Sequence, residues 1–551
     1  MDAAAILGTL AVIWAPGALL ARACRLRERD ALAAFATHVA LGLAFWPLLF
    51  LFTSGWTVLR ARVVVAVLVL GALALVRVRR MRVLSLVVFA LVVLTRALHI
   101  RGLAFPPWVD PVHHAMIVRL LVEQGRLPAT YAPFIPESTF YYHWGYHAVI
   151  AFVAWVSGAT NPFDLPRLLL VTGQVLNALT FFAVYAGARA FLRSSRAALL
   201  AATIATLVSW FPAYYVSWGR YPQLAAMLIV PPLAVVLWRL GRHPTRGRFV
   251  ATALLAAGLL LIHVRVAIVF AVLALVLFAL LAKQRRWRGL VWCGVAAVAA
   301  FALTTPWFVH IARLPQVRAI VTSAATPNDL PRSLALAPHQ LFLYLAFVVA
   351  LCVRRRTWIL AAVIVIVAVL VNLAPSHLVP NSAAVIMLFL PLSIAAADAL
   401  TFLLPRHIAI VTIAAALAGA ISMRTIVNPA TILATRADLE AMHWIATHTP
   451  PTARFAIDAA PWQDGAYRGI DGGAWIAVLT GRPTTLPPGL YAWVMAPRAA
   501  RETDALVEAS RVHEFAALRA AGVTYVYTRD ATLPLHRVYS RDGVVIYELP
   551  R

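Results

Sequence analysis

The chain has 551 residues, of which 62% are apolar and only 13% are charged. Apolar runs of about 17–25 residues recur along it between short arginine clusters, a pattern typical of a polytopic α-helical membrane protein. A net charge of +27 would suggest nucleic acid as the partner of a soluble chain, but arginines that flank membrane spans account for it here. We therefore expect a multi-pass protein of the cytoplasmic membrane with no nucleic-acid partner.

Residues 1–82 are expected to form the N-terminal membrane helices. The run from Ala3 to Leu20 has no basic segment before it and several arginines after it, which predicts a retained span with an extracytoplasmic N-terminus. Further spans are predicted at about 32–53, 60–76 and 83–98, with a cytoplasmic cluster between the last two at Arg77, Arg79, Arg80 and Arg82. The segment after the fourth span is then extracytoplasmic.

That segment, an outer loop at residues 100–163, gathers an acid, several histidines and many aromatic residues. Asp110-Pro111 is typical of a helix start, with Asp as the N-cap and Pro in the first turn, and Gly125 would end this helix after Gln124. The stretch 142–157 predicts a second helix, which is short for a span. We place the first helix at the membrane surface and expect the second to be interfacial or half-buried.

Ten further spans are predicted at about 166–191, 197–215, 223–239, 249–262, 266–282, 289–305, 338–353, 358–373, 382–402 and 407–423, for a total of about 14. Residues 83–427 would form the transmembrane core. From about residue 428 the charges become mixed and the apolar runs shorten. Helices at about 431–448 and 500–521, with strands at about 453–457, 523–528 and 544–549, predict a small extracytoplasmic α/β domain at 428–551.

Asp110 is the leading catalytic candidate. A carboxylate beside the membrane can take a proton from an acceptor hydroxyl, or can help to hold a divalent cation such as Mg or Mn. The alternative is purely structural, because Asp before Pro is a common helix cap. The two roles are compatible, since an N-cap side chain lies at an exposed helix end.

Four histidines accompany this acid: His113 and His114 within one turn, and His143 and His147 four residues apart on one helix face. With Asp110 they could build a metal site, for which Asp110 and His114 are the candidate ligands. The other interpretation is that these histidines hydrogen-bond a substrate or act as a general base near neutral pH.

Arg220 and Arg265 are predicted near the outer interface, next to His263, and arginine binds phosphate oxygens in a bidentate way. Snorkelling to the interface is the alternative for these arginines and for Arg119. Tyr142 belongs to an aromatic group that can stack on sugar rings or form an interfacial belt. Two Gly/Asp/Trp-rich segments, 461–465 and 471–475, are turns that an acceptor could meet.

The order of these elements resembles the GT-C superfamily of polytopic glycosyltransferases. The resemblance covers about residues 83–290: a span leading to Asp110, a helix ending in Gly125-Arg126-Leu127-Pro128, the stretch Tyr141-Tyr142-His143-Trp144, and Asn161-Pro162-Phe163-Asp164-Leu165-Pro166-Arg167-Leu168 before the next span. The superfamily includes protein O-mannosyltransferases and aminoarabinose transferases, which use polyprenyl-phosphate-linked sugars.

This resemblance implies transfer of a hexosyl or pentosyl group from a polyprenyl-phosphate donor in the membrane lipid to an extracytoplasmic acceptor. By this resemblance Asp110 matches the acidic residue of the first loop that is taken as catalytic, as a base or a metal ligand. Under the same glycosyltransferase hypothesis, the chemistry of the other candidates makes them the expected substrate-binding residues: His113, His114, Tyr142, His143, His147, Arg220, His263 and Arg265. The family often has a second acid near the first, where this chain has Pro111 and His113. The segment at Trp462 matches the Trp-Trp-Asp motif of oligosaccharyltransferases poorly, which does not support a peptide acceptor.

Two other classes remain as alternatives. A flippase or transporter for lipid-linked sugars would also have many spans, but transport usually places polar residues near the bilayer centre, where Asp398 is the main candidate. A non-catalytic assembly protein for envelope polysaccharide predicts that Asp110 can be lost without effect.

Overall fold

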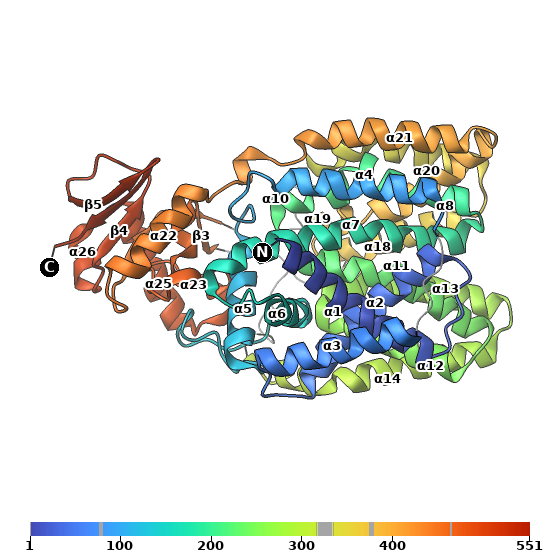
Figure 1. Ribbon diagram of the computed structural model, residues 1–551, viewed down its shortest axis with the longest axis horizontal. Coiled ribbons are helices and arrows are strands. Elements are labelled where there is room, and N and C mark those ends of the chain that lie inside the picture. Colours follow the sequence, from blue (N-terminus) through green and yellow to red (C-terminus); the bar gives the residue numbers. More distant parts are fainter. Residues whose placement is uncertain are drawn as a thin grey trace.

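The computed structural model describes residues 2–75, 81–315, 317, 333, 335–373, 379–462 and 465–550. A long helical bundle fills one part of the molecule, and a smaller domain of mixed helix and sheet lies beyond one of its ends (Figure 1). Within the described residues, ten helices are long and apolar enough to cross a membrane. The protein is therefore a multi-pass membrane protein, as the apolar runs predict.

The long apolar helices are α1 (Asp2–Ala23), α2 (Ala31–Leu51), α3 (Val58–Leu75), α4 (Val83–Ile100), α7 (Leu165–Leu192, after the short η1, Pro162–Asp164), α11 (Tyr221–Arg242), α13 (Val264–Lys283), α14 (Trp287–Ala312), α20 (Phe389–Leu403, after α19, Asn381–Val385) and α21 (Ile408–Ser422, before η4, Met423–Thr425). The shorter bundle helices are α8 (Ser195–Thr203) with the π-helical η2 (Ile204–Val208), α12 (Arg246–Ile262), α17 (Leu341–Val353, after η3, Ala337–Gln340) and α18 (Thr357–Leu373). Each predicted span falls on one of these helices, but a count of fourteen membrane crossings stays a prediction.

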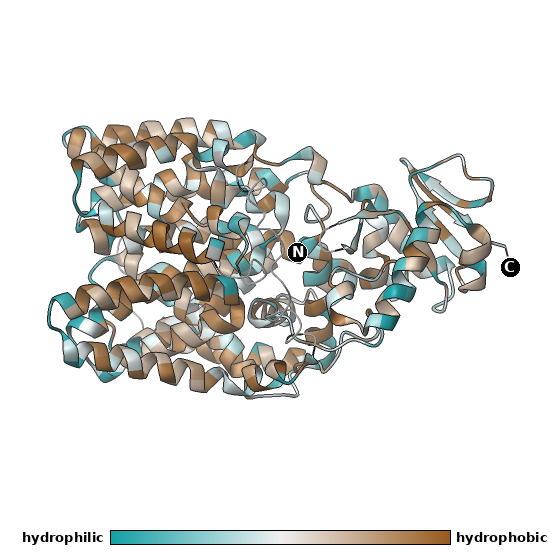
Figure 2. Cartoon of the chain, turned by 180° about the vertical axis from the view of Figure 1, so that it is seen from behind, coloured by the Kyte–Doolittle hydropathy of each residue, from teal (hydrophilic) through white to brown (hydrophobic). Residues whose placement is uncertain are grey.

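The outer helices of the bundle present large apolar side chains to the surroundings. Examples from α3, α14 and α21 are Leu70, Val298 and Ile421, which are 67%, 69% and 68% exposed. Figure 2 shows the bundle as mostly hydrophobic, whereas hydrophilic residues gather at its end turns and over the smaller domain. An apolar outer surface of this extent is stable only against lipid.

Arginine-rich turns meet at the end of the bundle far from the smaller domain, which we call the basic end. There Arg239 of α11 pairs with Glu28 of the turn after α1, and Arg82 donates to the Ser195 hydroxyl at 3.1 Å. At the opposite end the N-terminus lies near the smaller domain (Figure 1). The structure thus agrees with the predicted relative placement of these segments, while Arg77, Arg79 and Arg80 lie outside the described residues.

Two helices lie across the end of the bundle that faces the smaller domain: α5 (Asp110–Gln124) and α6 (Gly145–Ser157) (Figure 1). As predicted, α5 ends at Gly125, which has a left-handed φ of 60°. The predicted N-cap is wrong, because α5 begins at Asp110 itself, after Val109, and its start has no side-chain cap hydrogen bond. The Asp110 carboxylate is turned toward another segment of the chain.

The C-terminal part contains a four-stranded sheet with the order β1-β4-β6-β5, parallel between β1 and β4 and antiparallel elsewhere. Its strands are β1 (Phe455–Ile457), β4 (Tyr525–Thr528), β5 (His536–Arg541) and β6 (Val544–Glu548), and a separate hairpin joins β2 (Ala459–Pro461) to β3 (Tyr467–Gly469). The helices are η5 (Pro429–Thr431), α22 (Arg436–His448), η7 (Gly472–Trp475), α23 (Ile476–Thr480), α24 (Tyr491–Val494), α25 (Pro497–Arg511) and α26 (Phe515–Ala520).

The prediction of one helix at 500–521 is wrong, because α25 and α26 are separated at His513. This residue has a φ of 55°, which no right-handed helix accommodates. The predicted small α/β domain is otherwise present. The side chains that matter for function lie between this domain and the end of the bundle.

Candidate functional site

An acid–arginine pair lies where α5 meets the start of α11. Arg220 Nε is 3.5 Å from Asp110 Oδ2, and the two side chains are 22% and 18% exposed. The pair depends on a close approach of two backbones: Gly219 has a φ of 60°, and a Cβ at this glycine would lie 2.2 Å from Pro111 Cγ. Only glycine both adopts this conformation readily and leaves this space.

A cluster of imidazole and phenol rings continues from this pair into the protein. His114 Nδ1 lies 3.0 Å from His147 Nε2 across the α5–α6 contact. The His113 ring lies edge-on to the Tyr142 ring at 5.3 Å, and the Tyr142 ring stacks on that of His143 at 3.9 Å. The prediction that His143 and His147 share one helix face is wrong, because α6 begins at Gly145 and His143 precedes it. The fold nevertheless brings both histidines into one cluster with His113 and His114.

The turn between α12 and α13 completes the cluster. The ring of His263 lies 4.5 Å from that of His143. Arg265 follows on the first turn of α13, where it is exposed and its charge acts on both Tyr142 and His143. The structure therefore brings together the nine side chains that the sequence analysis selected, although their roles stay predictions. Arg119 is not among them, because it pairs with Glu123 and donates to the carbonyl of Val478.

Three buried ring nitrogens in this cluster have no hydrogen-bond partner within the described part of the chain: Nε2 of His113, Nε2 of His143 and Nδ1 of His147. Buried polar atoms are normally hydrogen-bonded. All three atoms belong to residues whose rings contact Tyr142, beside the acid–arginine pair. Imidazole nitrogens without a hydrogen-bond partner beside the acid–arginine pair indicate a binding site for a polar ligand.

Burial controls the protonation of this cluster. It lowers the pKa of His113 to about 4, with the Asp110 carboxylate opposing the shift. It lowers the pKa of His263 to about 3, and the charges of Arg265 and Arg220 add to the effect. Burial likewise lowers the pKa of His143 and raises that of Tyr142. At neutral pH the histidines are thus uncharged, and the charges at the site are those of Asp110 and the arginines.

The predicted metal site is not formed by these side chains. Among the described residues, no three histidine, cysteine or acidic side chains are grouped so that they could hold a metal ion. Of the two proposed ligands, Asp110 faces Arg220, and His114 directs Nδ1 at His147. Because the donor set does not fit a protein-bound metal, we derive no step through one.

The C-terminal domain covers one side of this cluster. A Cβ at Gly489 would lie 2.6 Å from the His113 Cβ, so this loop packs directly on α5. A narrow cavity lies between the domain and the start of α5, lined by Trp108, Val109, Val112, Leu433, Trp462, Tyr467, Arg468, Gly469, Asp471, Ala474, Trp475, Leu486, Pro487, Pro488 and Gly489. The Arg468 guanidinium lies 4.8 Å from the centre of the Trp108 ring.

One acid of this cavity has properties that sequence reasoning missed. Asp471 is 4% exposed, and its Oδ2 has no hydrogen-bond partner among the described residues. Burial, with the nearby Asp458 carboxylate, raises the pKa of Asp471 well above its usual range. The segment 471–475 was expected as a turn that an acceptor could meet, and its Asp-Gly-Gly sequence gave no sign of a buried acid. In the other predicted turn, Gln463 and Asp464 lie outside the described residues.

The fold and the site define a polytopic membrane protein that holds one acid–arginine pair and a neutral histidine cluster between its helical bundle and a C-terminal α/β domain. No protein-family model matches this chain, and no curated protein matches it.

Among solved structures, the chain is similar to the oligosaccharyltransferase of Archaeoglobus fulgidus. The form tethered with an acceptor peptide containing the NVT sequon is 14% identical, with coverage of 81% of this chain and 69% of that chain and a TM-score of 0.48. The complex with Zn and sulfate is 12% identical, with coverage of 80% and 67% and a TM-score of 0.47. The AglB complex with an inhibitory peptide and a dolichol-phosphate is 15% identical, with coverage of 80% and 69% and a TM-score of 0.40.

The archaeal enzyme is a GT-C glycosyltransferase, the class that the sequence resembles. At TM-scores below 0.5 the likeness assigns no donor, acceptor or residue role to this chain.

Proposed function

We propose that this protein is a membrane glycosyltransferase that moves a sugar from a polyprenyl-phosphate-linked donor to an extracytoplasmic acceptor. The observation that supports it most is the Asp110–Arg220 pair, 3.5 Å apart, at the end of a lipid-facing bundle. A lipid-linked donor needs a site that lipid reaches from one side and an aqueous acceptor reaches from the other. A base and a phosphate-binding arginine side by side suit that reaction.

The proposed chemistry needs one proton acceptor and one anion-binding group. An acceptor hydroxyl oxygen attacks the anomeric carbon of the donor sugar, and the bond from that carbon to the phosphate oxygen breaks. Asp110 takes the hydroxyl proton, while Arg220 and Arg265 stabilise the phosphate that leaves with the polyprenyl chain. When a donor phosphate engages Arg220, it competes with Asp110 for the guanidinium and leaves the carboxylate free to act as base.

The neutral rings would position the substrates. The unsatisfied Nε2 atoms of His113 and His143 can hydrogen-bond sugar hydroxyls, and Tyr142, which contacts both rings, can pack on the sugar. The topology predicted from the arginines places this site, the N-terminus and the C-terminal domain outside the cytoplasm.

The test uses Asp110→Asn in the full chain, reconstituted in liposomes with a labelled polyprenyl-phosphate sugar and an extracytoplasmic membrane extract as the acceptor source. We expect product formation to fall by at least about 100-fold, while the variant keeps its thermal unfolding midpoint. Glu123→Gln is the matched control, because it neutralises an exposed acid of the same helix that forms an ion pair with Arg119, outside the cluster.

Two results would contradict the proposal. Undiminished transfer by Asp110→Asn would remove the catalytic role of the acid. Movement of labelled donor across the bilayer, without any product from the wild-type protein, would identify a flippase instead.

A further inference from the structure

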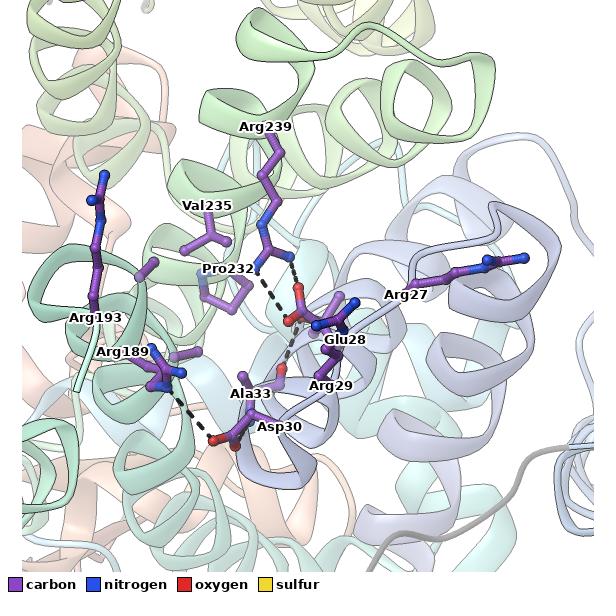
Figure 3. A pocket seen from close by; sticks show the side chains of 13 residues that line it. Arg27, Glu28, Arg29, Asp30, Ala33, Arg189, Arg193, Pro232, Val235 and Arg239 are labelled. Atoms are coloured by element: carbon purple, nitrogen blue, oxygen red, sulfur yellow. Dashed lines mark hydrogen bonds and ion pairs between the residues drawn. The ribbon is translucent and has the colours of Figure 1, made fainter. Parts of the chain in front are cut away.

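Two cavities open at the basic end, away from the proposed catalytic site. One has a volume of about 340 Å³ and the other of about 830 Å³. Both are lined by Arg27, Glu28 and Thr37, so they adjoin one another. The smaller lies between the turn that follows α1 and the last turns of α7 and α11 (Figure 3).

The smaller cavity carries an excess of positive charge. Its two carboxylates are already paired, Glu28 with Arg239 and Asp30 with Arg189 (Figure 3). Three further arginines that line it, Arg27, Arg29 and Arg193, have no acidic partner within the described part of the chain. Local charge balance therefore favours an anion at this position.

The larger cavity combines the same charge with an apolar wall. Arg22 lies in the last turn of α1, and Arg25 and Arg27 lie in the turn that follows. All three are exposed and have no acidic partner among the described residues. Below them the cavity is lined by apolar side chains of α1, α2 and α3, among them Trp14, Ala18, Ala34, Phe35, Ala74 and Leu75. The cavity thus runs from a basic mouth into the apolar part of the bundle.

The role of arginines in orienting a membrane protein explains the positive charge at the basic end, but it does not explain the adjoining cavities. Arginines that only orient a membrane protein need nothing more than water around them. A free phosphate ion would use the arginines and leave an apolar wall in contact with water, which is unfavourable. A molecule with an anionic phosphate and a hydrocarbon chain uses both parts, and basic pockets between membrane helices bind such lipid headgroups.

We propose that these adjoining cavities bind an anionic glycerophospholipid of the leaflet at the basic end. Its phosphate lies among Arg22, Arg25 and Arg27, and one acyl chain packs along Trp14 and Phe35 between α1, α2 and α3. The lipid joins the turn after α1 to α2 and α3. This binding is independent of the proposed transferase reaction, and its test measures lipid retention and stability alone.

The experiment uses the purified full chain after delipidation in detergent. Phosphatidylglycerol, phosphatidylcholine or inorganic phosphate is added, and bound lipid is counted by native mass spectrometry alongside the thermal unfolding midpoint. We expect phosphatidylglycerol to bind and raise the midpoint, and the other two additions to do neither. In Arg22→Gln/Arg25→Gln/Arg27→Gln, we expect phosphatidylglycerol retention to fall by roughly tenfold or more.

The matched control is Arg285→Gln/Arg286→Gln/Arg288→Gln. It removes three charges from another exposed turn, between α13 and α14, that lines neither cavity. The two triple variants are also matched in backbone conformation, because each replaces one residue with a left-handed φ, 53° at Arg25 and 54° at Arg285. Equal loss of lipid from both variants would overturn the proposal, as would equal stabilisation by inorganic phosphate. Should the first variant fail to fold, Arg27→Gln alone tests the arginine that both cavities share.

Discussion

At the scale of single residues, the proposed site depends on a glycine that has no chemistry of its own. Gly219 precedes Arg220 and lies against Pro111, which follows Asp110. Any side chain at this glycine would push the start of α5 away from the start of α11. Because Gly219 has no side chain, Pro111 can pack directly against it. This contact keeps Asp110 and Arg220, the neighbours of these two residues, 3.5 Å apart.

We predict that Gly219→Ala lowers glycosyl transfer by at least about tenfold, because sub-ångström displacement of reacting groups has effects of this order. The fold should survive, since the clash is with the Pro111 ring. Gly522→Ala is the control, because that glycine has a φ of 75° and no atom within 4 Å of an added Cβ. It introduces the same left-handed alanine without a clash. Equal activity of the two variants, measured with the labelled donor, would show that the close approach is unimportant.

The same residues show what the sequence could reveal. Asp110 was selected because of its neighbours along the chain. The end of its helix at Gln124 was predicted correctly, and the observed start at Asp110 is one residue before the predicted one. Its partner, Arg220, lies far away in sequence, and no local pattern links the two. The N-cap prediction failed because the Asp110 carboxylate faces a cation, a contact that periodicity and capping rules do not contain.

At the scale of elements, the turn between α17 and α18 is held to α20 by one buried acid. Asp398 is 1% exposed and receives Arg354 Nε at 3.1 Å and Arg356 Nε at 2.6 Å. Arg356 also donates to the carbonyl of Leu192 at the end of α7. Asp398 therefore connects segments at the basic end of the bundle, which corrects its expected position near the bilayer centre and removes it as a transport residue.

We predict that Asp398→Ala destabilises the protein by about 3 kcal/mol, because it leaves two arginines without their buried counter-ion. The readout is thermal unfolding in detergent, followed by tryptophan fluorescence. Glu502→Ala breaks the Arg498–Glu502 pair, whose side chains are 87% and 65% exposed, and should lower the unfolding temperature far less, because water screens an exposed ion pair. If the two variants unfold at the same temperature, Asp398 does not hold these elements together.

Elements with strong local signals were predicted well and others were missed. The long apolar helices and strand β6 follow directly from composition. Strand β5 (His536–Arg541) was missed because most of its residues are exposed and no apolar alternation marks it. Arg96 on α4 was also missed: it is 1% exposed and donates to Asn177 Oδ1 at 2.8 Å. Only the packing of α4 on α7 reveals why an arginine lies within this apolar helix.

At the scale of the whole molecule, the histidine cluster joins α5, α6 and the α12–α13 turn, so its protonation affects the stability of the assembled protein. The pKa of His113 is lowered to about 4 and that of His263 to about 3, below the usual 6.5. Between these values the unfolded chain binds more protons than the folded one. Stability therefore falls as the pH falls from about 6.5 toward 4.

We predict that the thermal unfolding midpoint decreases progressively between pH 6.5 and 4.5, and that it changes little from this cause between pH 7 and 8. His113→Gln/His263→Gln removes two of the groups and should show a smaller decrease across the same range. A double variant with an unchanged pH profile would mean that other groups, such as carboxylates, control acid unfolding.

The hydrogen bonds of the linker before the C-terminal domain have a further consequence. Asn428 N donates to Ser217 Oγ at 3.0 Å, and Trp108 N donates to the carbonyl of Thr431 at 2.7 Å. One short stretch of chain thus holds the segments just before Arg220 and just before Asp110. The domain cannot then act as a detachable module: a protease nick in this stretch, or the supply of the domain as a separate polypeptide, would leave the acid and the arginine without their common support.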